Sequence, residues 1–229
     1  MVEEYGIEVI VFDILGTMVD EPGGLRAAIR DAVPGADGES VEQLLTVWQG
    51  HVEHEQQRIA EKRREYANTD VIDREAAQLV ADRAGLTDPV AIARLATASQ
   101  RLKPWDDSVA GLARLARRFP VLGLSNASRA TLLRLNAYAQ LGWHQALSAE
   151  DAHAYKPAPE VYRLALDAAG CPPERVLMVA AHAWDLRGAQ AVGMRTAYVR
   201  RPVGDPPAST DTFNWRSSSL GELVTALTA

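Results

Sequence analysis

The chain has 229 residues, of which 47% are hydrophobic and 24% are charged, enough for one large domain or a core with a smaller insertion. Its formal net charge of -6 argues against nucleic acid or an anionic membrane as the main partner. The single cysteine, Cys171, excludes an internal disulfide bond, and no apolar stretch is long enough for a bilayer, so we expect a cytoplasmic protein.

The first predicted element is a strand over residues 7–12, which are nearly all apolar, as is typical of a strand buried on both faces. The strand ends at Asp13, and Gly16 and Thr17 follow in a predicted sharp turn. The sequence Glu-Pro-Gly-Gly at 21–24 is a cluster of chain breakers, which predicts a linker.

A helical block follows, because residues 25–99 contain no good strand pattern. Apolar residues recur at helical spacing from Val41 through Trp48 to Ile59, and residues 73–84 and 89–98 have helical patterns too. Residues 51 and 53–55 are two histidines and two glutamates, which splay around a helix and indicate a solvated face rather than a metal site.

Beyond a second predicted hinge at 102–106, helices and strands alternate. Strands are predicted over residues 121–124, 146–148, 175–179 and 196–199, and helices over 107–118, 129–139, 159–169, 185–192 and 220–227. Residues 201–212, rich in proline and small polar residues, predict a surface loop. The alternation predicts an α/β fold, a Rossmann-like doubly wound parallel sheet. We expect a core domain of residues 1–20 and 102–229, and an inserted helical cap domain of residues 21–101.

Polar and reactive side chains follow the predicted strands, at the edge of the sheet where ligands bind in such folds. An aspartate such as Asp13 can attack an electrophile and form a covalent ester. A nearby ammonium such as Lys156 lowers the pKa of that carboxylate. Ser125 and Asn126 can donate hydrogen bonds to an anion, although both also suit a helix N-cap. Asp185 can orient the lysine or help to activate water.

These residues lie in segments that resemble the four motifs of the haloacid dehalogenase superfamily. Residues 12–20 (Phe-Asp-Ile-Leu-Gly-Thr-Met-Val-Asp) resemble the first motif, and Leu-Ser-Asn at 124–126 resembles the second. Lys-Pro at 156–157 and the region of Asp185 resemble the third and fourth motifs, in the same order. The helical insertion lies where this superfamily places its cap.

Two departures favour one branch of that superfamily. Its phosphatases carry a general acid two residues after the nucleophile, where this chain has Leu15, and an acidic magnesium ligand where it has Ala181. A halide leaves without a proton, whereas an alkoxide needs one. Without a metal ion, a phosphate dianion would also be repelled by the Asp13 carboxylate. Both losses make the chain resemble the (S)-2-haloacid dehalogenases.

That resemblance implies a reaction without metal ion or other cofactor, in which Asp13 displaces halide from a 2-haloacid and water hydrolyses the resulting ester. It implies that Lys156 neutralises the charge of Asp13, that Asp185 positions the lysine and the water, and that Thr17 forms a hydrogen bond near the nucleophile. It also implies that Ser125 holds the substrate carboxylate, that Asn126, Trp184 and Leu15 line the pocket, and that Tyr162 supports the site, although Tyr162 and Trp184 could equally be core aromatics.

The chain departs from this branch before its Trp-Asp pair, where the relatives commonly have Ser-Ser-Asn and this chain has Ala-Ala-His at 180–182. His182 could hydrogen-bond, act as a base or narrow the halide pocket. A small pocket would suit haloacetates, including fluoroacetate. The branch also uses a cap arginine for the halide, for which Arg58 is the first candidate; its rivals are Arg30, Arg63 and Arg64.

The predicted function is hydrolytic dehalogenation of short 2-haloalkanoic acids. The alternatives are a phosphatase or phosphonate hydrolase of the same superfamily, and a non-catalytic relative that binds a small acid. The expected partner is a small-molecule substrate, and the resemblance allows a homodimer.

Overall fold

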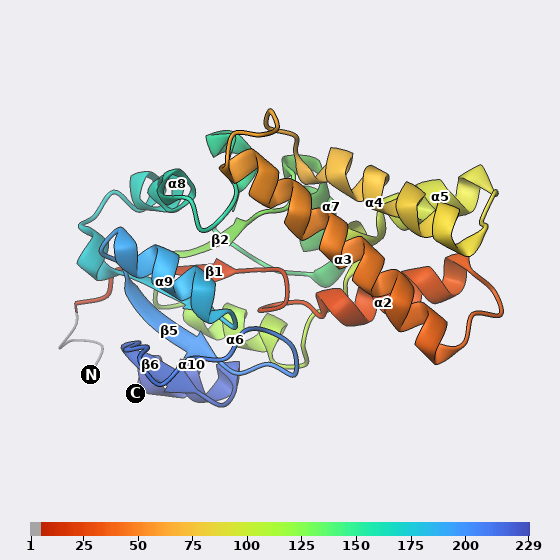
Figure 1. The fold of residues 1–229 in the computed structure, drawn as a ribbon. Coiled ribbons are helices and arrows are strands. Elements are labelled where there is room, and N and C mark those ends of the chain that lie inside the picture. Colours follow the sequence, from red (N-terminus) through yellow and green to blue (C-terminus); the bar gives the residue numbers. More distant parts are fainter. Residues whose placement is uncertain (1–5) are drawn as a thin grey trace.

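A single parallel sheet forms the centre of the molecule in the computed structural model, which describes residues 6–229 (Figure 1). Its six strands run in the order β3-β2-β1-β4-β5-β6, and every neighbouring pair is parallel. The strands are β1 (Val9–Asp13), β2 (Val121–Ser125), β3 (Gln145–Ser148), β4 (Val176–Ala180), β5 (Arg195–Val199) and β6 (Trp215–Ser217). The predicted α/β doubly wound fold is confirmed.

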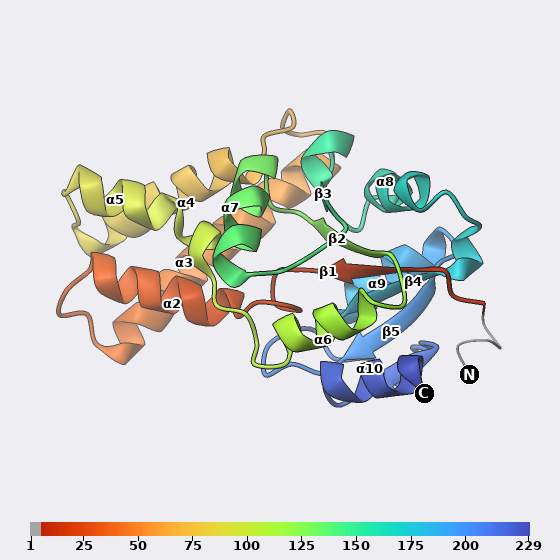
Figure 2. The same ribbon diagram turned by 180° about the vertical axis from the view of Figure 1, so that it is seen from behind.

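Helices cover both faces of the sheet, and each face has its own buried apolar cluster. Figure 2 shows α6 (Ser108–Leu115), α7 (Arg129–Ala139) and α10 (Leu220–Thr228) on one face. The other face, toward the viewer in Figure 1, carries α8 (Pro159–Ala169) and α9 (Ala183–Ala191). Strand β1 and its neighbours β2 and β4 are buried on both sides, and because the three strands are parallel, their carboxyl ends meet at one edge of the sheet.

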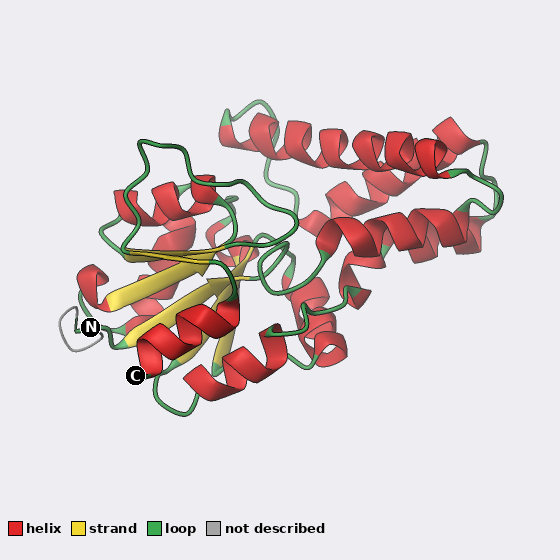
Figure 3. Cartoon of the chain, turned by 90° about the horizontal axis from the view of Figure 1, so that it is seen from below, coloured by secondary structure: helices red, strands yellow, loops and turns green. Residues whose placement is uncertain are grey.

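The chain between β1 and α6 forms a separate helical lobe beside the sheet (Figure 3). It contains α2 (Glu21–Ala32), α3 (Gly38–Ala60), α4 (Thr69–Ala84), α5 (Pro89–Ala96) and the short 3-10 helix η1 (Ala98–Arg101). A buried cluster that includes Leu25, Trp48, Val80 and Leu95 holds these helices together, apart from the two clusters on the sheet. Two further 3-10 turns, η2 (Ala149–Ala152) and η3 (Pro173–Arg175), lie in the core. We call the lobe the cap.

The segment 21–24, interpreted from its sequence as a linker, is the first turn of α2. The Asp20 carboxylate accepts a hydrogen bond from the main-chain N–H of Gly23 at 3.0 Å, which caps the helix. Pro22 suits this position because its missing N–H has no partner to lose in a first turn. The strand β6 has no counterpart among the elements predicted from the sequence.

The cap is fastened to the core at the start of α4. Thr69 Oγ1 accepts a hydrogen bond from the N–H of Ser128 at 2.7 Å, and Asp70 Oδ1 accepts one from the Ser128 hydroxyl at 2.6 Å. Asn68 Nδ2 donates to Glu150 Oε1 at 3.1 Å, close by. These contacts fix the position of the cap over the edge of the sheet at which β1, β2 and β4 end.

No helix within residues 6–229 is both long enough and apolar enough to cross a membrane.

Candidate active site

Three charged side chains meet at the carboxyl edge of the sheet. Lys156 Nζ lies 2.8 Å from Asp13 Oδ1 and 2.8 Å from Asp185 Oδ2, so one ammonium joins two carboxylates. All three residues are buried, with 5% of Lys156, 7% of Asp13 and none of Asp185 exposed. The three residues come from the end of β1, the loop before α8 and the first turn of α9, and the structure brings them together as the sequence predicted.

The electrostatics of this cluster keep Asp13 ionised. Burial alone would raise the pKa of Asp13, but the Lys156 ammonium and His182 outweigh it and bring the pKa well below its ordinary value. Burial would lower the pKa of Lys156, but the two carboxylates more than offset this and raise it. At neutral pH the site therefore holds a carboxylate and an ammonium in direct contact.

Hydrogen bonds fix both carboxylates in orientation. The Thr17 hydroxyl donates to Asp13 Oδ2 at 2.6 Å and accepts from the N–H of Ala181 at 2.9 Å, which ties β1 to β4. The Tyr162 hydroxyl donates to Asp185 Oδ1 at 2.6 Å. Gly188 leaves room for this phenol, because a Cβ there would lie 2.4 Å from the Tyr162 oxygen. Thr17 and Tyr162 thus contact the cluster, as predicted.

The end of β2 supports the site in two different ways. Asn126 Oδ1 accepts a hydrogen bond from the N–H of Lys156 at 2.9 Å, which holds the lysine loop in place. Ser125 is fully buried, and its hydroxyl oxygen accepts from the N–H of Ala127 at 3.1 Å. Asn126 lines the cavity described below, whereas Ser125 does not, so the structure does not bring Ser125 to the place expected for the substrate carboxylate.

His182 lies directly beside the nucleophile candidate, with Nδ1 3.3 Å from Asp13 Oδ2. The turn after β1 makes room for its ring, because Gly16 has a φ of +77 and a Cβ there would lie 2.6 Å from His182 Cε1. On its other side the ring packs near Trp184, with 5.8 Å between the ring centroids. Burial would lower the pKa of His182, but its hydrogen bond to Asp13 and the charges of Asp13, Asp185 and Glu21 raise it overall.

A cavity of about 930 Å³ opens between the cap and this edge of the core. Four of the predicted site residues line its core side: Leu15, Asn126, Lys156 and Trp184. On the cap side, α3 contributes Trp48, Gln49, Val52, Glu53, Gln56, Gln57 and Ala60. Asp13 itself does not line the cavity but contacts Lys156, which does.

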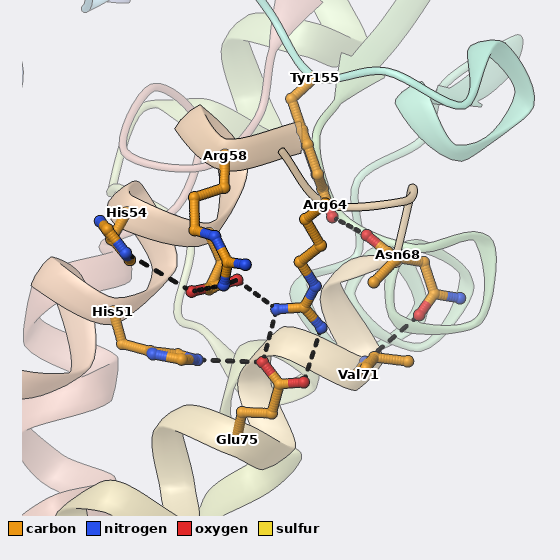
Figure 4. A network of polar contacts seen from close by, with 10 residues as sticks. His51, His54, Arg58, Arg64, Asn68, Val71, Glu75 and Tyr155 are labelled. Atoms are coloured by element: carbon orange, nitrogen blue, oxygen red, sulfur yellow. Dashed lines mark hydrogen bonds and ion pairs between the residues drawn. The ribbon is translucent and has the colours of Figure 1, made fainter. Parts of the chain in front are cut away.

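The cap arginines proposed for the halide lie elsewhere. Arg58 Nη1 donates to both oxygens of Glu55 at 3.1 Å, and Arg64 joins Glu55 to Glu75 (Figure 4). Arg63 pairs with Glu61, and Arg30 is exposed on α2. Within residues 6–229, no arginine lines the cavity. The expectation that Arg58 meets the halide is therefore wrong, because the Arg58 guanidinium is held by the buried carboxylate of Glu55 on the same helix.

Of residues 51 and 53–55, interpreted as a solvated face, Glu53 and His54 are exposed as expected, whereas the same network corrects the interpretation for Glu55 and His51. Glu55 is buried and binds two arginines, and His51 Nε2 lies 3.1 Å from Glu75 Oε2 (Figure 4). Among residues 6–229, no three His, Cys, Asp or Glu side chains are grouped as a metal site.

We expect Arg58→Ala to leave the kcat/KM of the enzyme within about twofold of the wild type, because its guanidinium contacts neither the cavity nor the charged cluster. Steady-state kinetics on the purified variant would check this. A fall of more than tenfold, roughly 1.4 kcal/mol in transition-state stabilisation, would show that Arg58 reaches the substrate after all.

Two carboxyl groups in the cavity wall were missed by the sequence analysis. Burial raises the pKa of Glu21 to about 7, with Asp13 adding to the shift and His182 opposing it. Burial raises the pKa of Asp73 to about 8, although a hydrogen bond from Ser99 at 3.0 Å opposes the change. Near neutral pH Glu21 is thus about half protonated and Asp73 is mostly protonated, so each can donate a hydrogen bond from its protonated form.

Asp73→Asn should stabilise the protein in a pH-dependent way. Since its pKa is about 8 when folded and near its ordinary 3.8 when unfolded, the stability that Asp73 contributes is complete below about pH 4 and is lost as the pH rises to about 8. Asn removes this titration and can still accept from Ser99. The variant's advantage should grow by up to about 1.4 kcal/mol per pH unit over that window and then level off.

Urea unfolding of both proteins at about pH 5, 7 and 9 would measure this advantage. A difference in stability that does not change with pH would contradict the assignment of a raised pKa to Asp73.

The chain is similar to known proteins in both sequence and structure. The model of the haloacid dehalogenase-like hydrolases matches residues 7–193. The (S)-2-haloacid dehalogenase H-109 of Pseudomonas putida is 31% identical over 223 residues, which cover 95% of this chain and 96% of that protein.

Solved structures give the same result. The L-2-haloacid dehalogenase of Xanthobacter autotrophicus with chloropropionic acid covalently bound has a TM-score of 0.83 and 26% identity, covering 97% of this chain and 99% of that one. A defluorinating L-2-haloacid dehalogenase has a TM-score of 0.88 and 27% identity, covering 97% of this chain and 96% of that one. The chain therefore belongs to the haloacid dehalogenase-like hydrolases, in the branch of its (S)-2-haloacid dehalogenase relatives.

Proposed function

We propose that this enzyme hydrolyses short 2-haloalkanoic acids to 2-hydroxy acids through a covalent ester on Asp13, without a metal ion. The observation that carries the proposal is the 2.8 Å contact between Asp13 Oδ1 and Nζ of Lys156, a residue that lines the cavity. The ammonium supplies the positive charge that keeps Asp13 ionised and compensates the charge of an incoming carboxylate.

In the first step, a carboxylate oxygen of Asp13 attacks C2 of the haloacid, and the halide leaves with the bonding electrons. This displacement inverts C2 and consumes no proton. Leu15, two residues after the nucleophile, has no proton to give, and a halide leaving group does not require one. The site thus suits carbon–halogen cleavage better than cleavage of a phosphate ester.

In the second step, water attacks Cγ of Asp13, and the carbon–oxygen bond inside the former carboxylate breaks. The 2-hydroxy acid leaves, and Asp13 is a carboxylate again. Asp185 holds Lys156 in place throughout both steps with one carboxylate oxygen, and the Tyr162 hydroxyl fixes the other carboxylate oxygen of Asp185. The relative from Xanthobacter autotrophicus, with chloropropionic acid covalently bound, supports a covalent route.

The substrates that fit best are short acids with one carboxylate. The cavity walls combine apolar groups such as Leu15 and Trp48 with amides such as Gln49 and Asn126. Amide N–H groups can hold a carboxylate or a departing halide without a guanidinium. A similar structure belongs to a defluorinating enzyme, which makes fluoroacetate a candidate beside chloroacetate and (S)-2-chloropropionate.

Halide release by the purified enzyme tests the proposal. We expect chloride from chloroacetate and (S)-2-chloropropionate, with the same rate before and after treatment with a chelator. Asp13→Asn serves as the blank. No halide above that blank from any of these acids, or magnesium-dependent hydrolysis of p-nitrophenyl phosphate instead, would overturn it. Fluoride release from fluoroacetate decides the range of halides separately.

A further inference from the structure

We propose that His182 is the general base that activates the hydrolytic water, and that it becomes competent only once Asp13 has been esterified. This inference rests on the proposed function, because it concerns the second half of the same reaction. It assigns a catalytic role to a residue at which this chain departs from the motif of its branch.

The position of His182 suits attack on the ester. Its Nδ1 lies 3.3 Å from Asp13 Oδ2, and the carbon that water must attack is one bond beyond that oxygen. A water molecule can therefore touch Nδ1 and Cγ at the same time. The side chain keeps 19% of its surface exposed, so solvent reaches the ring, while Asp13 beside it is nearly covered.

The ring is held in this place from several sides. Gly16 gives it room after β1, as described above, and Trp184 packs near it. Its main chain leads into α9, where the N–H of Ala183 donates to the Asp205 carbonyl at 2.9 Å and the N–H of Trp184 donates to Asp205 Oδ2 at 3.0 Å. A base that is fixed before the reaction loses little entropy during it.

Asp185 is less suited to the same task, although it also lies near the nucleophile. Its Oδ2 accepts from Lys156 at 2.8 Å, its Oδ1 accepts from Tyr162 at 2.6 Å, and the residue has no exposed surface. Both oxygens are already hydrogen-bonded, and water has no open path to them. Asp185 therefore positions the lysine, and His182 is left to act on the water.

The charge of Asp13 switches His182 between two states. Burial favours neutral His182, and three carboxyl groups that surround it favour the cation: Asp13 on β1, Glu21 on α2 and Asp185 on α9. The contact with Asp13 is the strongest of these. When Asp13 becomes a neutral ester, that contact no longer favours the cation, and the pKa of His182 falls.

The proton balance closes over one turnover. His182 releases its proton to solvent when the ester forms, and the halide leaves as the anion. The neutral ring then takes a proton from water as the hydroxide oxygen bonds to Cγ. As the tetrahedral intermediate collapses, the product oxygen receives that proton from His182. The proton of the new Asp13 carboxyl group returns to His182, which restores the resting pair.

His182→Asn separates the two steps experimentally. Asn keeps a side-chain N–H that can donate to Asp13 but does not titrate, and the two serines that precede this Asn in the relatives are Ala180 and Ala181 here. We expect a burst of one halide per active site at a rate close to that of the wild type, followed by steady-state turnover about 10²–10⁴-fold slower. Intact-protein mass spectrometry during turnover of chloroacetate should show the enzyme carrying one added carboxymethyl group.

The pH dependence gives a second readout. In the wild type, the rate of ester hydrolysis should increase with pH and level off above the pKa of His182 in the esterified enzyme. This increase of the rate with pH should be absent from His182→Asn. The control is His54→Asn, since 64% of the His54 side chain is exposed on the cap; it should behave as the wild type in every assay.

The outcomes distinguish this inference from the proposed function. If the wild type releases no halide, the proposed function fails. If the wild type releases halide but His182→Asn loses the burst, shows no ester or turns over normally, the role of His182 is wrong. His182→Gln, with melting temperatures for both variants, provides the test if the Asn variant does not fold.

Discussion

Asp13→Asn should abolish halide release, with kcat/KM reduced by a factor of at least about 10⁴. The neutral amide oxygen is a far weaker nucleophile than a carboxylate, and no second carboxylate holds the same place, because both oxygens of Asp185 are bound to Lys156 and Tyr162. A halide assay on the purified variant, with chloroacetate in excess, measures the loss.

The melting temperature provides the control for this variant, because Asp13 is buried and bonded to Lys156, Thr17 and His182. A folded Asp13→Asn protein that keeps a tenth or more of the wild-type rate would exclude Asp13 as the nucleophile.

Lys156→Met should have the second largest effect, on both activity and stability. The variant leaves Asp13 and Asp185 buried without their shared cation, and loss of one partner from such a group costs about 3–5 kcal/mol. The pKa of Asp13 should rise, because burial favours its neutral form once the ammonium is gone. Activity should fall by a factor of about 10² or more at neutral pH.

The residual activity of Lys156→Met should decrease as the pH falls, because Asp13 becomes protonated in the variant. At the same pH values Asp13 of the wild type stays ionised, so the wild-type rate should not change for this reason. A pH–rate profile and a urea unfolding curve measure the two effects. Lys103→Met is the matched control, because the Lys103 side chain is exposed away from the charged cluster. A Lys156→Met variant as stable and as active as Lys103→Met would contradict the electrostatic role.

Much of the site could be predicted because it lies at strand ends. Asp13 directly follows an apolar run, and the carboxyl ends of β1, β2 and β4 must meet at one edge once the sheet is parallel. Chain order and residue type, together with the resemblance to the four motifs, were then enough to place Lys156 and Asp185 beside Asp13, whereas the hydrogen bond from the Lys156 N–H to Asn126 was not predicted.

The cap was harder to predict, because both faces of α3 carry polar residues. The residues of α3 that line the cavity recur every three to four positions, from Trp48 through Val52 and Gln56 to Ala60. Arg58 lies off that stripe and beside Glu55, a pattern that was available in the sequence. The raised pKa values of Glu21 and Asp73 were not, because they arise from tertiary packing rather than from local sequence.

The most direct test of the account is one turnover in water labelled with heavy oxygen, with enzyme in excess over chloroacetate. If water attacks Cγ of an Asp13 ester, the label should appear in the Asp13 carboxylate, found by peptide mass spectrometry, and the glycolate should carry ordinary oxygen. Label in the glycolate with none in Asp13 would mean that water attacks the substrate directly, which contradicts a covalent intermediate.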